Sequence, residues 1–177
     1  MIIKKTYNML FFFLFGLLSW SQQGIIDSVQ NPRLFVKGFA KKNAIYLRWG
    51  VNDKWAWEYG NQYGYLVERT TIFRDGYPLE KSEKVILTGG PIKPKPLPQW
   101  EFLMQDNDMA AVAAQAIYGE SFSVNDESEN LFMKVVNESS ELEQRFGFSM
   151  FAVDQDFTAA QYAGLGYVDA DVRPNER

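Results

Sequence analysis

Hydrophobic and polar residues alternate along the first half of the chain, and this period of two predicts β-strands. In the clearest segment Ile45, Leu47 and Trp49 form one apolar face. We expect Tyr65 and Val67 to face inward with them, because a chain without disulfides needs large aromatic side chains in its core. Strands are therefore predicted at residues 34–37 (an edge strand), 45–49, 63–70 and 84–88.

Turn and linker residues divide these strands from one another and from the rest of the chain. Asp75-Gly76 is a typical turn pair between the third and fourth strands. The stretch 91–98 carries four prolines, which favour an extended, stiff connector and exclude a central strand. The sequence thus separates a β part, residues 33–90, from a block at 99–164 with a different periodicity.

Three aromatic residues, Trp55, Trp57 and Tyr59, lie in a stretch rich in Asn, Asp and Gly that we predict to be a loop. They follow no strand periodicity. Two interpretations remain open for them. They cover the end of the strand layers as a lid, or they form a binding site by stacking against a sugar ring.

The second half of the chain has the periodicity of amphipathic helices. One helix is expected after a cap at Asp106 or Asp108 and ends at Gly119. Its apolar stripe is formed by Met109, Val112, Ala113, Ala116 and Ile117. A second helix is predicted to begin near Asn125 or Asp126, with an apolar side formed by Leu131, Phe132, Val135 and Val136.

Further caps predict how the helical block ends. Ser140 and Glu143 have the spacing of a capping box and predict the start of another helix. The apolar stripe of that helix is formed by Leu142, Phe146, Met150, Val153 and Phe157. A short helix at 158–163 is expected to end at Gly164, and a brief strand is predicted at Tyr167-Val168.

The first 21 residues have the layout of a secretory signal peptide. Lys4 and Lys5 precede an apolar run from Met9 to Leu18, and Ser19 and Ser21 provide small residues for cleavage after Ser21. A membrane anchor is the alternative, but the run has about half of the roughly 20 apolar residues that span a bilayer. We expect a polar lead at 22–32, no stable membrane insertion after cleavage, and a secreted or cell-surface location.

Composition narrows the possible chemistry. Removal of Lys4 and Lys5, with no acid lost, changes the formal net charge from −4 to −6, which disfavours nucleic-acid partners. The chain has neither cysteine nor histidine, which excludes Ser-His-Asp catalysis and the usual zinc sites. We expect no cofactor and no metal.

The strand segments resemble a known family. The sequence Ile45-x-Leu47-x-Trp49, followed by Gly64-Tyr65-x-Val67-x-Arg69, is similar to the B and C strands of a fibronectin type III domain. The resemblance implies a buried B-strand tryptophan beside a C-strand tyrosine. Residues 33–90 would then supply strands A, B, C and C′ of an immunoglobulin-like β-sandwich.

The helical block resembles the insertion found in variant fibronectin type III-like modules of large secreted bacterial proteins. In those modules a Gly-Leu…Asp…Val-x-Pro-Gly motif follows the insertion, and this chain has Gly164-Leu165, Asp169, Val172 and Pro174, with Asn175 in place of the last glycine. The expected fold class is α+β, an incomplete sandwich followed by a helical insertion. Residues 165–177 would return toward the sandwich and be truncated, leaving strand C with an open edge. A fragment of a longer protein and completion by a partner strand are both open.

The acidic residues form no motif that is specific for one kind of metal site or reaction. The clusters 106–108, 125–129 and 169–171 have oxygen ligands but lack a calcium-loop pattern, and helix caps or solvated loops explain them. Asp154 and Asp156 are a carboxylate pair that a glycoside hydrolase could use, although nothing in the sequence sets their separation.

The sequence therefore predicts no catalytic residues and no enzyme activity. The expected function is a non-catalytic, exported module that acts as a spacer or protein-interaction domain. Its partners would be other domains, cell-surface proteins or glycans. A carbohydrate-binding module using Trp55, Trp57 and Tyr59 is the first alternative, and a carboxylate-based hydrolase fragment is the second.

Overall fold

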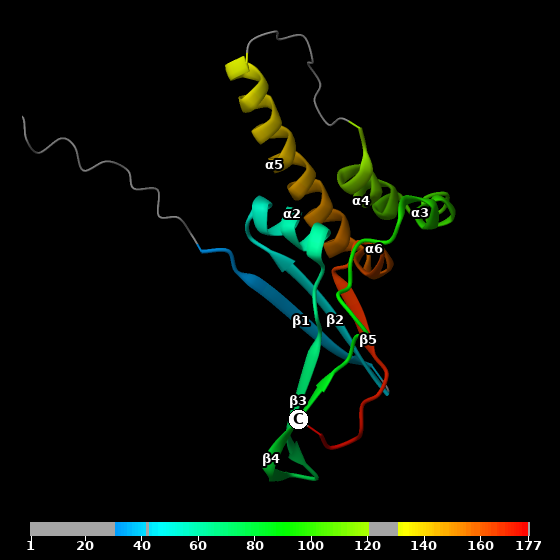
Figure 1. The fold of residues 1–177 in the computed structure, drawn as a ribbon. Helices are drawn as coiled ribbons and strands as arrows, with labels where there is room; N and C mark the ends of the chain where they lie inside the picture. The colour runs from blue at the N-terminus through cyan, green and yellow to red at the C-terminus, as the bar shows by residue number, and fades with distance from the viewer. Residues whose placement is uncertain (1–30, 42, 121–130, 177) are drawn as a thin grey trace, which may run out of the picture. The chain divides into compact units, whose positions relative to one another are not determined.

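A three-stranded antiparallel sheet is the largest β element of the chain (Figure 1). Strand β1, Leu34–Lys41, pairs with β2, Ala44–Val51, through a short hairpin, and β2 pairs on its other side with β5, Gly166–Asp169. The predicted strands at 34–37, 45–49 and 167–168 are confirmed, and the first does lie at the sheet edge. The period-two pattern identified β2 because Ile45, Leu47 and Trp49 lie on one face of the strand, and Arg48 and Gly50 lie on the other.

The computed structural model describes residues 31–41, 43–120 and 131–176, and side chains in the last range from residue 140. The predicted signal peptide and almost all of the polar lead lie outside this range, as does the predicted helix start near Asn125 or Asp126. All elements described below belong to one compact unit, Pro32–Arg177. In the part of the chain that is described, no helix combines the length and the apolar character that crossing a membrane requires.

The second sheet is the hairpin of β3, Glu68–Arg74, and β4, Tyr77–Ile86. The predicted turn is confirmed, since Asp75 and Gly76 both have positive φ, 52° and 85°, as a tight two-residue hairpin turn requires. The strand predicted from residue 63 begins later, at Glu68, and Tyr65 instead makes an isolated bridge with Ile92. The strand predicted at 84–88 is the end of the longer β4.

The stretch predicted to be an aromatic loop is a helix, α2, Lys54–Tyr63. Asp53 caps its first turn by accepting a hydrogen bond from the Ala56 N–H at 2.9 Å. Gly64, with a φ of 81°, ends it. The loop prediction was wrong because aromatic residues on both sides of α2 hide the apolar stripe.

The other helices of the described residues lie between β4 and β5 in the chain. The proline-rich connector is shorter than predicted, because α3, Leu97–Leu103, begins inside it with Pro98 in its first turn. Helix α4, Asp108–Tyr118, is confirmed, although Asn107 provides its cap in place of Asp106 or Asp108. A long helix and a short one follow, α5, Leu131–Gln155, and α6, Phe157–Tyr162.

The predicted capping box at Ser140 and Glu143 is wrong, because α5 is continuous through both residues. The Ser140 hydroxyl accepts a hydrogen bond from Gln144 Nε2 at 3.3 Å, one turn further along the same helix. The short helix predicted after Thr158 is confirmed as α6, and Gly164, with a φ of 73°, follows its end.

The core lies where the helices meet β2. Trp49, Trp100 and Leu165 are buried together with small residues of α4, α5 and α6, among them Ala110, Ala113, Ala152, Ala159 and Ala160. Leu47, Tyr65 and Val67 pack against this cluster, and the Trp49 and Tyr65 rings meet edge to face at 5.8 Å. The chain is thus an α+β protein with two small antiparallel sheets and, among the described residues, five helices.

Candidate functional site

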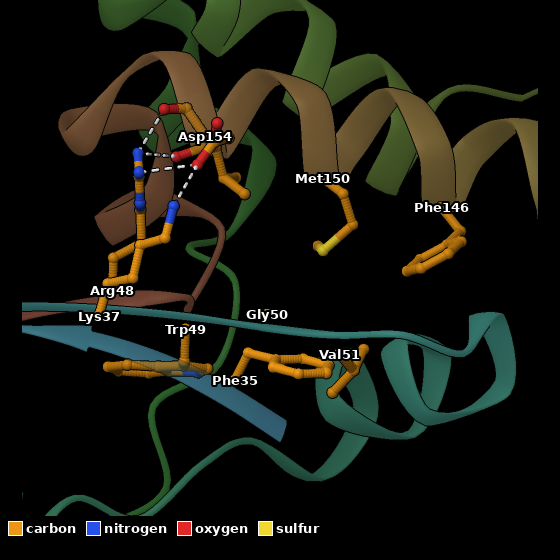
Figure 2. Close-up of a pocket in the computed structure, with 10 residues that line it drawn as sticks. Phe35, Lys37, Arg48, Trp49, Gly50, Val51, Phe146, Met150 and Asp154 are labelled. Atoms are coloured by element: carbon orange, nitrogen blue, oxygen red, sulfur yellow. Dashed lines mark hydrogen bonds and ion pairs between the residues drawn. The ribbon is translucent and has the colours of Figure 1, made fainter. Parts of the chain in front are cut away.

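An apolar groove opens between the β1–β2 end of the sheet and α5 (Figure 2). Its volume is about 300 Å³, at the lower end of the range of about 300–1,000 Å³ for small-molecule sites. Its apolar lining consists of Phe35, Trp49, Gly50, Val51, Phe146, Met150 and Val153. This size suits one or two large side chains better than a whole extended ligand.

Local sequence explains the shape of the groove. Phe146, Met150 and Val153 recur at helical spacing on α5, and Figure 2 shows Met150 and Phe146 directed from α5 toward β2. Gly50 leaves room beneath them, since an added Cβ would lie 3.3 Å from Met150 Sδ. The missing side chain therefore lets α5 approach the sheet while the groove stays open.

Charged residues close one end of the groove. Arg48 donates hydrogen bonds to the carbonyl oxygens of Val153, at 2.9 Å, and Asp154, both in the last turn of α5. Its guanidinium also lies 2.7 Å from Asp154 Oδ1, and Lys37 Nζ lies 3.9 Å from the same oxygen. A cation at a helix C-terminus complements the carbonyl dipoles there. With two cations to one carboxylate, this end is net positive.

Strand β1 borders the groove and is exposed along its whole length. Phe35 and Phe39 are more than half exposed, as are Leu34 and Val36. Such a long apolar edge strand is unusual, because natural sheets ordinarily cover or blunt their edges. Lys37, whose side chain is 79% exposed, is a blunting residue of this kind.

The sheet register shows which backbone groups of β1 face outward. The Asn52 N–H donates to the Arg33 carbonyl at 3.3 Å, and Arg33 shares the alternation of Phe35, Lys37 and Phe39. These odd-numbered positions direct their N–H and C=O groups toward β2. The groups that point to the free edge of β1 therefore belong to Leu34, Val36, Gly38 and Ala40.

The three aromatic residues predicted to bind a ligand do not share one face. Trp57 is only 3% exposed and its Nε1–H donates to Ser149 Oγ at 3.2 Å, beneath α5. Trp55 and Tyr59 are mostly exposed, and so is Tyr63, whose ring stacks on that of Tyr59 at 6.0 Å. The spacing of four places Trp55, Tyr59 and Tyr63 on one side of α2. Sequence reasoning missed Tyr63, although this spacing would have identified it in a helix.

Asp154, Asp156 and Asp169 have structural partners. Asp156 caps α6 by accepting a hydrogen bond from the Ala159 N–H at 2.6 Å, and Asp154 pairs with Arg48. Asp169 Oδ2 lies 2.6 Å from Arg69 Nη1, which ties β5 to the β3–β4 hairpin. Within the described ranges, no group of three or more His, Cys, Asp or Glu side chains is arranged to hold a metal ion.

Ionisation is perturbed at positions away from the groove. Burial raises the pKa of Tyr65, whose hydroxyl is buried and has no hydrogen-bond partner among the described residues. Gly60 makes this possible, because an added Cβ would lie only 1.9 Å from that hydroxyl oxygen. Hydrogen bonding to Arg74 lowers the pKa of Glu83 on the β3–β4 hairpin. Neither Tyr65 nor Glu83 lines the groove, so these pKa shifts do not concern its chemistry.

Comparison with protein-family models, curated proteins and solved structures gives no match for this chain.

Proposed function

We propose that this chain is a non-catalytic, exported module that binds another polypeptide at the free edge of β1. The observation that carries the proposal is the eight-residue edge strand, exposed throughout, beside an apolar groove. An added strand gains main-chain hydrogen bonds from such an edge, and a neighbouring pocket selects one of its side chains. The module would act as a spacer or interaction domain of a secreted or cell-surface protein.

A fibronectin type III-like arrangement is part of this proposal. It is supported by the edge-to-face packing of Trp49 on Tyr65 and by the position of α3–α6 in the chain between β4 and β5. In such a sandwich the free edge of β3 would take a further strand. An isolated bridge between Arg74 and Glu176 already lies at that edge.

Export is supported by the signal-peptide pattern of the first 21 residues. The absence of cysteine is compatible with it, because a core packed around Trp49, Trp100 and Leu165 does not need disulfides. Export predicts that the cleaved chain is found outside cells that express it. The substitution Leu14→Arg, which disrupts the apolar run, should keep the chain inside the cells.

Selection of peptides from a displayed random library tests edge binding. The purified chain should enrich peptides that, on binding, slow hydrogen exchange at the amides of Val36, Gly38 and Ala40. Val36→Pro should abolish binding without unfolding the protein, because the lost N–H points away from β2. Val36→Ala is the matched control and should still bind. Enriched peptides that protect other amides, or no enrichment at all, would refute the proposal.

Glycan binding is a second candidate, favoured by the exposed aromatic row Trp55, Tyr59 and Tyr63 on α2. Flat aromatic rings on one side of a helix offer stacking surfaces for sugar rings. Retention on immobilised polysaccharides should be lost in Trp55→Ala and Tyr59→Ala if this candidate holds. Unchanged retention, or none for the unmodified chain, would exclude it.

A further inference from the structure

The exposed face of β1 that borders α5 alternates apolar and cationic residues. Phe35, Lys37, Phe39 and Lys41 occupy successive positions on this face, because their cross-strand partners include Arg48 and Gly50, which face α5. Neither β1 nor the preceding Arg33 provides an acid, although the chain as a whole has a formal net charge of −4. The edge is therefore a local cationic strip on an acidic protein.

This charge pattern argues against a second copy as the occupant. Two β1 strands paired with each other would place each lysine opposite a lysine or a phenylalanine, since the strand has no carboxylate. Like charges directly opposite one another destabilise a strand pair. Lys37 also has little compensation of its own, because Asp154 is shared with Arg48.

We propose that the occupant is an extended peptide that runs antiparallel to β1 and alternates acidic and apolar residues. This inference rests on the proposed function. Acidic residues of the peptide lie opposite Lys41 and Lys37, and apolar residues lie opposite Phe39 and Phe35. The apolar residue opposite Phe35 enters the groove beneath Met150.

The backbone geometry is consistent with this pattern. The outward N–H and C=O groups of Val36, Gly38 and Ala40 bond to the peptide residues between the acidic and apolar ones. The odd-numbered positions then form non-hydrogen-bonded pairs, in which facing side chains are closest. Gly38, in the middle of the edge, adds no side chain against which the peptide would clash.

Each exposed ion pair contributes a factor of roughly one and a half to five in affinity at low salt. Exchanging two acids of the peptide for lysines replaces two attractions with two repulsions. We therefore expect a difference of roughly tenfold between such peptides, and it should shrink as salt rises.

The test uses two dye-labelled, capped peptides, Glu-Thr-Phe-Thr-Glu-Thr-Phe and Lys-Thr-Phe-Thr-Lys-Thr-Phe, with fluorescence anisotropy against the purified chain. The glutamate peptide should bind roughly tenfold more tightly. Lys37→Glu should remove or reverse this preference, and Lys41→Glu provides a second reversal if the first variant does not fold. Lys81→Glu, on the exposed part of β4, makes the same charge change elsewhere and should leave the preference unchanged.

Equal binding of the two peptides, a preference unaffected by either β1 reversal, or no binding of the glutamate peptide would overturn the inference. The proposed function, docking at the edge of β1, is tested separately by Val36→Pro. If both peptides bind equally and both are lost in Val36→Pro, docking at the edge stands and only the residue pattern is wrong.

Discussion

Strand β2 has two neighbours of opposite character. On one side β5 has four residues, its two ends are buried, and the core residue Leu165 precedes it. On the other side β1 has eight residues and all of them are exposed. Both strands contain apolar residues, so hydrophobicity alone does not distinguish them. What differs is the covering, since α6 and the core pack against β5 whereas no described element covers the free edge of β1.

Helix α2 shows the same division on a smaller scale. Trp57 is directed under α5, whereas Trp55, two residues earlier, is 52% exposed. In both cases the covered part packs in the core, and the uncovered part stays exposed. Substitutions on the covered and the uncovered sides should therefore change stability by different amounts.

The two tryptophans of α2 should differ most. Trp57→Ala should lower the free energy of unfolding by about 3–5 kcal/mol, because it leaves a large cavity and an unpaired Ser149 hydroxyl. Trp55→Ala should cost less than about 1 kcal/mol. Urea denaturation followed by circular dichroism measures both. Equal losses would mean that α2 has no distinct inner and outer side.

The same substitution on the two sides of β2 provides a matched pair. Leu165→Ala should cost about 2–5 kcal/mol, since the side chain is fully buried beside Trp49. Leu34→Ala, at a half-exposed side chain of β1, should cost less than about 1 kcal/mol. A large loss at Leu34 in denaturant titrations would show that β1 is covered in solution.

Two tyrosines of the covered region should respond with opposite signs. Tyr65→Phe removes a buried hydroxyl without a partner among the described residues and should leave stability unchanged or raise it by up to about 1 kcal/mol. Tyr167→Phe removes a hydroxyl that donates to the Leu87 carbonyl at 2.8 Å and should cost about 0.5–1.5 kcal/mol. Thermal melts of both variants measure these changes. A loss of stability in Tyr65→Phe would contradict the prediction.

The weakest expected effect is a pH dependence at the β3–β4 hairpin. Hydrogen bonding to Arg74 lowers the pKa of Glu83 in the folded chain. The stability that this pair adds to the hairpin is therefore fully present above the ordinary carboxyl pKa of 4.5 and is lost as pH falls through the lowered value. Arg74 also binds Glu176, beside the hydrogen bond from the Asp75 N–H to Asn175 at 3.0 Å. The Asp75 amide resonance should therefore stay constant well above the ordinary carboxyl pKa and shift as pH falls below it. Glu83→Gln should remove part of that shift.

Local patterns predicted much of the fold. Alternation identified the strands around Trp49, and Gly119 and Gly164 correctly ended two helices. The pattern failed at α2, where the caps Asp53 and Gly64 were the useful signals, and at Ser140, where a cap-like spacing lies inside a long helix. The packing of a whole helix overrides a short capping motif inside it, as at Ser140, and the sequence alone does not show where this happens.

The groove could not be predicted in this way. It combines Phe35 and Trp49 with Met150, residues that only the tertiary fold brings together. Its dimensions depend on the absence of a side chain at Gly50, which has no meaning until α5 is known to lie opposite. Whether the aromatic residues near Trp55 bind sugars stays a prediction.

The pairing of β2 with β5 also constrains how the chain acquires its structure. The Trp49 N–H donates to the Leu165 carbonyl, and the whole helical block lies between these two residues in the chain. Pairings between such distant segments pay a large entropic cost before they return any stability, which slows folding. When only β1 and β2 have left the ribosome, the sheet still lacks its third strand, β5. The three-stranded sheet can form only after the chain has been synthesised through β5.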